Sequence, residues 1–479
     1  MKVRRVYMLT LLFLLMVSIL WPVVKPQQEK GRVHQHLENH VAAPDGTSEK
    51  LTTHLPIITI DTEGGKAIPQ ERGTAADSTR QQSVRSQIQL FDEANKVHST
   101  DDTPRATTLA EVAYRGNSSR HFDKKSLKVR FIDDKGEDSK LTLAGMAEES
   151  EWVLHGPFLD RTLVRNYLAY NISGEIMEYA PNVRYCELVL NGKYQGLYLA
   201  VESIEQGPYR IAIDKSDPKS TTTPYIVVWD RSHKAKNVVN NYVRYIHQSG
   251  ISTLDIRYPN IEKITDAQKD FVEKDISKIE RILYSYDLKQ YDQYLDKNAF
   301  AEYFIINEFF RNADAGKFST YLYKDLREKM KLVVWDFNNA FDNYSDVEYD
   351  AAGFTMLDVP WFSMLIKDRE FIDLVVNKYH ELRKTTLSTA YLEQYVDDTV
   401  SFLGPAVERN NDKWGYVFDL SKPDGVNYLV PFERNQKSYE ESVDSLKDFI
   451  EDRGRWLDDH IETLYQYSAP SKNTNTLLE

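Results

Sequence analysis

The sequence predicts an α+β protein with a β-rich N-terminal part and a mainly helical C-terminal part. Short alternating segments bounded by turn residues dominate up to about residue 204, and apolar residues recur at helical spacing after Pro259. A small hairpin pattern interrupts the helical part at residues 319–335. The length of 479 residues allows one large domain with an appendage or two moderate domains.

Composition narrows the class of protein. Hydrophobic residues make up 41% and charged residues 28%, which excludes collagen-like, wholly disordered and polytopic membrane proteins. The net charge is −13 and no long basic stretch is present, so we expect no nucleic-acid partner. Cys186 is the single cysteine, which excludes a disulfide framework and a cysteine-based zinc site.

The first residues predict delivery to or across a membrane. Lys2, Arg4 and Arg5 precede an uncharged run of 19 residues from Val6 to Val24. Residues 1–24 are therefore a signal peptide or a signal anchor, and the lack of small residues directly after the run favours an uncleaved membrane anchor. The basic flank predicts that everything after Lys25 is extracytoplasmic, either membrane-anchored or secreted. Residues 25–54, rich in polar residues without periodicity, read as a flexible linker.

The β-rich part is expected over residues 55–204. Asn191-Gly192 is a strong hairpin signal between two of its strands, and Arg161–Met177 carries apolar residues at helical spacing. The strands are predicted at residues 55–60, 86–91, 126–131, 184–190 and 195–201.

The helical part is expected over residues 205–467, followed by a tail at 468–479. Its two short strands, 319–323 and 332–335, are separated by a charged turn. The helices are predicted at residues 266–286, 297–310, 362–383, 390–402 and 438–467.

Two segments carry candidate chemistry. A small-residue loop, Arg115 to Arg120, precedes a lysine-bearing strand and is able to approach phosphates, although a plain polar turn is the simpler interpretation. Asp314 and Asp336 stand at the entry and the exit of the hairpin, which should bring them close together. Two such carboxylates suit a substrate hydroxyl and a Mg²⁺ ion, whereas turn carboxylates that cap backbone N–H groups are the alternative.

Several hydrolase and nucleotide motifs are absent from the sequence. Gly316-Lys317 lacks the upstream glycine and the following hydroxyl residue of a P-loop, and no His-Glu-x-x-His occurs. Gly116-Asn117-Ser118-Ser119 lacks the second glycine of a nucleophile elbow. His155 is the one histidine in motif-like sequence, and a lone histidine is more often structural.

A long series of segments, in this order and spacing, resembles the CotH family of protein-kinase-like proteins, named from a bacterial spore-coat protein. The segments are Leu55–Asp61, Arg115–Ser119 with Lys124-Lys125-Ser126, Trp152–Asn166, Asn191–Tyr198, Phe304–Glu308, Asp314 with Ser319–Lys324, Trp335–Asn338 and Leu446–Leu457.

The resemblance implies a two-lobed atypical protein-kinase fold that uses ATP with Mg²⁺ or Mn²⁺ to phosphorylate Ser or Thr hydroxyls of a protein substrate. It assigns Asp314 to orienting the acceptor and Asp336 to the metal, with Ser319 and Asn338 as further metal contacts. It assigns the phosphates to Arg115, Gly116, Asn117 and Ser118, with Lys125 or Lys128 as the pairing lysine. Strand alternation places those two lysines on opposite faces.

The sequence also departs from ordinary kinases. No His-Arg-Asp, Asp-Phe-Gly or Ala-Pro-Glu segment occurs, and the glutamate partner of the lysine stays open among Glu151, Glu175 and Glu202. A cell-surface binding or structural protein on the same fold, without catalysis, is the main alternative. A metal-dependent phosphate-ester hydrolase with the same carboxylates is a third.

Overall fold

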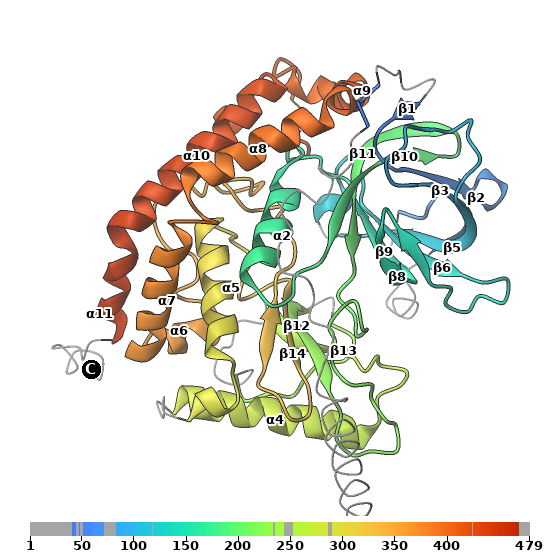
Figure 1. Cartoon of the computed structure of the whole chain (residues 1–479). Coiled ribbons are helices and arrows are strands. Elements are labelled where there is room, and N and C mark those ends of the chain that lie inside the picture. Colours follow the sequence, from blue (N-terminus) through green and yellow to red (C-terminus); the bar gives the residue numbers. More distant parts are fainter. Residues whose placement is uncertain are drawn as a thin grey trace, which may run out of the picture.

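The computed structural model describes residues 41–44, 47, 51–70, 83–116, 118–232, 235–243, 252–285, 290–423 and 425–468. The chain is α+β, with a β-barrel on one side and helices on the other (Figure 1). Across the described ranges, no helix is long and apolar enough to cross a membrane. The apolar run at residues 6–24 lies outside those ranges, as do residues 25–40 of the predicted linker and residues 469–479 of the predicted tail.

Seven strands close the barrel in the order β10-β11-β9-β6-β5-β3-β2. Parallel pairing of β2 with β10 completes the closure, with Ile57 opposite Glu187. Asn191 and Gly192, both with positive φ, form the predicted hairpin turn. The strands are β2 (Ile57–Thr62), β3 (Val84–Phe91), β5 (Ala106–Tyr114), β6 (Leu127–Ile132), β9 (Glu151–His155), β10 (Val183–Leu190) and β11 (Lys193–Glu202). Two short pairs lie beside them, β1 (Thr52–Thr53) with β4 (His98–Ser99) and β7 (Leu141–Leu143) with β8 (Met146–Glu149).

A second sheet belongs to the C-terminal part, which the sequence predicted as mainly helical. Its order is β13 (Ser252–Tyr258), β12 (Tyr225–Arg231), β14 (Thr320–Lys324) and β15 (Lys331–Val333). Strand β12 is buried over its first five residues, so it shows no alternation by which the sequence could reveal a strand. Helix α4 (Asp266–Tyr284) lies across the end of this sheet in Figure 1.

Helix α5 (Lys297–Phe309) is buried along most of its length by neighbouring helices and by strand β15. The helix predicted over 362–383 breaks into two because the side chain of Asp368 caps the second helix by accepting from the N–H of Glu370. The helix predicted from residue 161 begins only at Arg165, after Leu163 adopts a φ of 65°. The elements are α2 (Arg165–Ile176), α6 (Phe362–Leu365), α7 (Arg369–Leu382), α8 (Thr389–Leu403), α9 (Pro405–Trp414), α10 (Tyr439–His460) and α11 (Tyr465–Ser468).

Two cores meet at the wall of the barrel. Trp152 and Leu154 of β9 point into the barrel core, whereas Val153 between them packs with Leu199 and Val201 of β11 into the larger core around α2. Helix α2 lies between the barrel and the helices (Figure 1). Strand alternation thus gives this wall an inner face and an outer face, and the outer face borders the candidate site.

Candidate functional site

The two aspartates singled out by the sequence lie at the two ends of one hairpin. Asp314 lies in the turn after α5, and Asp336 follows β15, which pairs with β14. Because the hairpin turns the chain back, Asn339 Nδ2 donates a hydrogen bond to Asp314 Oδ2 over 2.8 Å. The structure therefore joins the Asp314 turn to the segment after Asp336, as the hairpin predicts.

Burial and neighbouring charges act on the carboxyl group of Asp314 in opposite directions. Its side chain is buried, and burial raises the pKa of the carboxyl group; the charge of Asp336 raises it further, while Arg231 opposes both. Arg231 Nη2 lies 3.5 Å from Asp314 Oδ2, and its guanidinium lies 4.2 Å from the ring centroid of Phe318. A carboxylate with a raised pKa accepts a proton more readily than an ordinary aspartate.

Asp336 occupies a strained but well-bonded backbone position. Its φ is 63°, a left-handed conformation that aspartate tolerates better than most residues. Its N–H donates to the hydroxyl of Tyr170 on α2 over 3.1 Å, and its carbonyl accepts from Asn312 Nδ2 over 3.4 Å. The N–H of Asn338 approaches Asp336 Oδ1 at 3.4 Å. The turn after β15 is thereby attached to both α2 and the loop that follows α5.

A chain of buried polar contacts links the barrel to this turn. The side chain of Asn166, on α2, accepts from the N–H of Phe337 over 3.1 Å and donates to Asn338 Oδ1 over 2.9 Å. Its amide nitrogen lies 3.4 Å from His155 Nε2, and His155 Nδ1 lies 3.3 Å from Ser126 Oγ. Burial, aided by the charge of Arg115, lowers the pKa of His155 to about 3, so the ring is neutral at ordinary pH.

A narrow cleft separates the outer face of the barrel from the turn after β15, which carries Asp336 and is called the aspartate turn below. About 10 Å³ of the cleft is accessible to water. Arg115 faces the turn across the cleft, with its guanidinium 5.4 Å from the ring centroid of Trp335. The lining residues are Arg115, Val153, His155, Asn166, Tyr170, Val201, Trp335, Asp336 and Asn338. Three residues predicted from the sequence, Arg115, Asp336 and Asn338, are thus brought together here.

The phosphate loop predicted from the sequence also includes Gly116, Asn117 and Ser118. Gly116 has a φ of 109°, and a Cβ there would lie 1.9 Å from Ser119 Oγ, so the loop requires glycine at this point. Asn117 lies outside the described residues, and Ser118 begins a short 3₁₀ turn over Ser118–Arg120.

The two candidate lysines lie on opposite faces of the barrel wall, as alternation predicts. Lys128 lies on the outer face of β6, where its Nζ is 2.5 Å from Glu151 Oε2. Lys125 instead lines the open end of the barrel, where its Nζ donates to the carbonyl of Phe122. Lys125 is therefore not brought to the cleft.

The three glutamates left open by the sequence have different partners. Glu151 pairs with Lys128, Glu202 pairs with Arg210 over 2.7 Å between fully buried side chains, and Glu175 accepts from Tyr391. Of these, only Glu151 contacts a candidate lysine of the described chain.

The oxygen donors near the turn suit a hard divalent cation. The described residues contain no group of three or more His, Cys, Asp or Glu side chains placed to hold a metal. Mg²⁺ needs no such cage, because one or two carboxylates, phosphate oxygens and several waters together complete its octahedron. Asp336 fits this role with the neighbouring Asn338 amide, whereas Ser319, five residues after Asp314, is not among the residues that line the cleft.

Several residues of the site were not predicted. Asn166, Tyr170, Asn339 and Arg231 come from α2, the turn after β15 and the end of β12. A signal was present for Asn166, a polar residue within the predicted helix directly after Arg165, and for Asn339, which directly follows Asn338. No sequence signal connects Arg231 with Asp314, since the contact depends on sheet pairing.

Comparison with known proteins covers most of the chain. A family model described as "CotH kinase protein" matches residues 112–457, a range that contains every candidate site residue named above. "Inner spore coat protein H" of Bacillus subtilis (strain 168) is 21% identical over 361 residues, which cover 74% of this chain and 88% of that protein.

Proposed function

The chain belongs to the CotH family, and from that premise we propose that it is an ATP-dependent protein kinase that phosphorylates Ser or Thr hydroxyls of extracytoplasmic proteins. The observation that carries the proposal is the pair of aspartates on one hairpin, Asp314 and Asp336, with Arg115 of the barrel facing the second of them. Phosphoryl transfer requires acidic residues that hold a divalent metal and cationic residues that neutralise the phosphates, and the two walls of the cleft provide one of each kind.

The architecture supports a two-lobed, kinase-like fold. The barrel, residues 55–204, corresponds to an N-terminal lobe, and residues 205–467 correspond to a C-terminal lobe that carries both aspartates. Among the described residues, strand pairing begins slightly before residue 55, since Thr52 and Thr53 pair with β4. The cleft between Val153 of the barrel and Trp335 of the hairpin is the proposed nucleotide site. Because the cleft is narrow, nucleotide entry requires the two walls to separate.

Each residue then has a defined task. Asp336, with Asn338, would hold the divalent cation, and Arg115 would neutralise phosphate oxygens from the opposite wall. Lys128 does not line the cleft, but it lies opposite Val153 of the cleft wall and would serve as a second cation on leaving Glu151. Asp314 would orient the acceptor hydroxyl and take its proton, a role that its raised pKa favours. Bound ATP with its metal supplies the phosphoryl group and the neutralising charge, while the chain supplies position.

Two observations support an extracytoplasmic site of action. Basic residues precede the apolar run Val6–Val24, which predicts that the remainder of the chain is translocated. The relative from Bacillus subtilis is a spore coat protein by name. We propose a protein of the spore or cell surface as the substrate, with the N-terminal segment as a membrane attachment or a secretion signal.

Phosphate incorporation from γ-labelled ATP tests the proposal. The whole chain is incubated with ATP and Mg²⁺ or Mn²⁺, alone and with a generic acidic or basic protein, beside Asp314→Ala and Asp336→Ala. Asp346→Ala is the matched control, because Asp346 is an exposed aspartate of the same region. We expect incorporation to be lost in the first two variants and retained in the control. Full incorporation in either aspartate variant would refute the assigned roles.

A non-catalytic binding or structural protein is the second candidate. The ion pair between Arg231 and Asp314 favours it, because a substrate hydroxyl must compete with the guanidinium for the carboxylate. Metal-dependent ATP binding without any incorporation, measured on the same preparation, would support this candidate over the kinase.

A further inference from the structure

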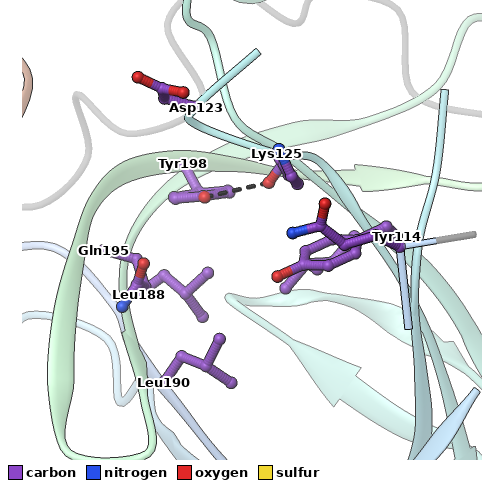
Figure 2. A pocket seen from close by; sticks show the side chains of 9 residues that line it. Tyr114, Asp123, Lys125, Leu188, Leu190, Gln195 and Tyr198 are labelled. Carbon is purple, nitrogen blue, oxygen red and sulfur yellow. Dashed lines mark hydrogen bonds between the residues drawn. The ribbon is translucent and has the colours of Figure 1, made fainter. Parts of the chain in front are cut away.

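The open end of the barrel contains a second hollow, separate from the candidate cleft (Figure 2). About 300 Å³ of it is accessible to water, which lies at the lower limit of small-molecule sites, and the mouths of β-barrels are a recurrent place for such sites. Its floor is formed by Leu127, Leu188 and Leu190, which continue the barrel core outwards. The hollow thus borders the apolar core of the barrel.

The rim of the hollow carries a cation with donors to spare. Lys125 Nζ donates to the carbonyl of Phe122 over 2.7 Å and lies 6.0 Å from the ring centroid of Tyr114. An ammonium has three donors, so further hydrogen bonds to a ligand are available to it. Tyr198, whose hydroxyl donates to the carbonyl of Lys125, forms the adjacent wall, as Figure 2 shows.

The acidic group of the rim, Asp123, hydrogen-bonds to partners outside the hollow, although its charge also raises the pKa of Lys125 against the burial that lowers it. Asp123 Oδ2 accepts hydrogen bonds from the hydroxyl of Tyr416 and from Asn427 Nδ2. In Figure 2 the Asp123 side chain lies apart from the leucine floor, whereas Lys125 lies nearer to it. An apolar floor beneath an ammonium group is complementary to an anion with an apolar body.

Strand alternation keeps this hollow distinct from the cleft. Tyr114 lines the hollow and the next residue, Arg115, lines the cleft; Lys125 and Leu127 line the hollow, while Ser126 between them contacts His155 of the cleft. The two sites share strands but no lining residue. A substitution in the hollow therefore replaces no residue of the candidate active site.

We propose that the open end of the barrel is a binding site for a small organic anion with an apolar body, its carboxylate directed to Lys125 and its chain lying on Leu127, Leu188 and Leu190. The site does not depend on kinase activity. A bound carboxylate would also offset the burial that lowers the pKa of Lys125.

Titration calorimetry with octanoate and with the neutral 1-octanol tests the proposal on the whole chain, without ATP or metal. Lys125→Met removes the charge but keeps most of the side chain, and Lys135→Met, in the exposed turn after β6, is the matched control. We expect Lys125→Met to weaken octanoate binding about tenfold and to leave 1-octanol binding unchanged. Lys135→Met should change neither.

Two further measurements keep the test decisive if Lys125→Met folds poorly. Lys125→Arg retains the charge and should retain octanoate binding, and methyl NMR of the unaltered chain should show octanoate-dependent shifts at Leu127, Leu188 and Leu190. No saturable octanoate binding up to about 10 mM would overturn the site. Equal affinity for octanoate and 1-octanol would overturn its preference for an anion, and methyl shifts confined to other leucines would overturn its location.

Discussion

Replacing Arg453 by methionine should lower the free energy of unfolding by about 3–5 kcal/mol, because it leaves a buried carboxylate without its partner. Arg453 on α10 is fully buried. Its guanidinium donates to the backbone carbonyl of Glu308 over 2.7 and 3.0 Å and to Glu308 Oε2 over 3.1 Å. It also donates to the carbonyls of Ala351 and Gly353, which lie in the segment that follows the aspartate turn.

The size of the effect follows from the surroundings of Glu308. Burial raises the pKa of this carboxyl group even in the intact chain, where Arg453 and the N–H groups of Thr355 and Met356 oppose the rise. Without the guanidinium the folded-state pKa rises further above its ordinary value of 4.5, so the folded variant binds its proton more tightly than the unfolded chain does. The variant should therefore lose stability as pH rises above that value, and more steeply than the parent.

Urea denaturation followed by circular dichroism measures this loss, and hydrogen exchange of residues 349–356 measures the release of the anchored segment. Arg455→Met is the matched control, because Arg455 lies on the same helix, 61% exposed, in surface ion pairs with Glu451 and Asp452. It should cost less than about 1 kcal/mol. The double variant with Glu308→Gln should be less unstable than the sum of the single variants. Equal losses for Arg453→Met and Arg455→Met would refute the reasoning.

Three further predictions concern the site and the fold. Asn166→Ala removes the bonds to Phe337 and Asn338 and should weaken metal-dependent ATP binding about tenfold in equilibrium dialysis, an expectation contradicted by unchanged affinity. Gly116→Ala should weaken the same binding, because a φ of 109° beside Arg115 is strained for any residue with a side chain and the new Cβ would also crowd Ser119; a Gly136→Ala control, at a positive φ of 86° with open space, tests the backbone effect alone. Burial raises the pKa of Glu280 to about 7 from 4.5, so the melting temperature of the parent should fall as pH rises between these values. Glu280→Gln should flatten that profile, and a profile as steep as the parent's would count against the assignment.

Local pattern was sufficient for several elements with one exposed face, although β5, β13 and α9 also have exposed residues and were not predicted. Strand β3 alternates between buried and exposed residues at its start, and α4 and α10 carry one apolar stripe each, so β3, α4 and the start of α10 could be predicted to within a few residues. Helix α10 ends at His460, earlier than the predicted residue 467, because a 3₁₀ turn follows it. Strands β9 and β12 are buried on both faces and show no period, which is why the sequence did not reveal them. The break before α7 was missed because a capping aspartate outweighed a continuous apolar pattern.

The candidate site was likewise predictable where its contacts are local and not where they depend on long-range packing. Asp314 and Asp336 could be paired from the sequence because the hairpin between them is short and local. Arg231 reaches Asp314 only because β12 pairs with β14, and Asn166 reaches Asn338 only because α2 packs beside the turn after β15. Such contacts join residues separated by 83 and 172 positions along the chain.

The sequence by itself determined the α+β class, the local hairpins and the two aspartates, since short-range periodicity and turn chemistry specify these features. Tertiary structure alone decided the closure of the barrel by β2 and β10, the position of Lys125 at its open end and the approach of Arg115 to Asp336. The physical reason is that long-range pairing and packing select which faces of neighbouring strands meet, and a local pattern records only that a face is buried, not against what.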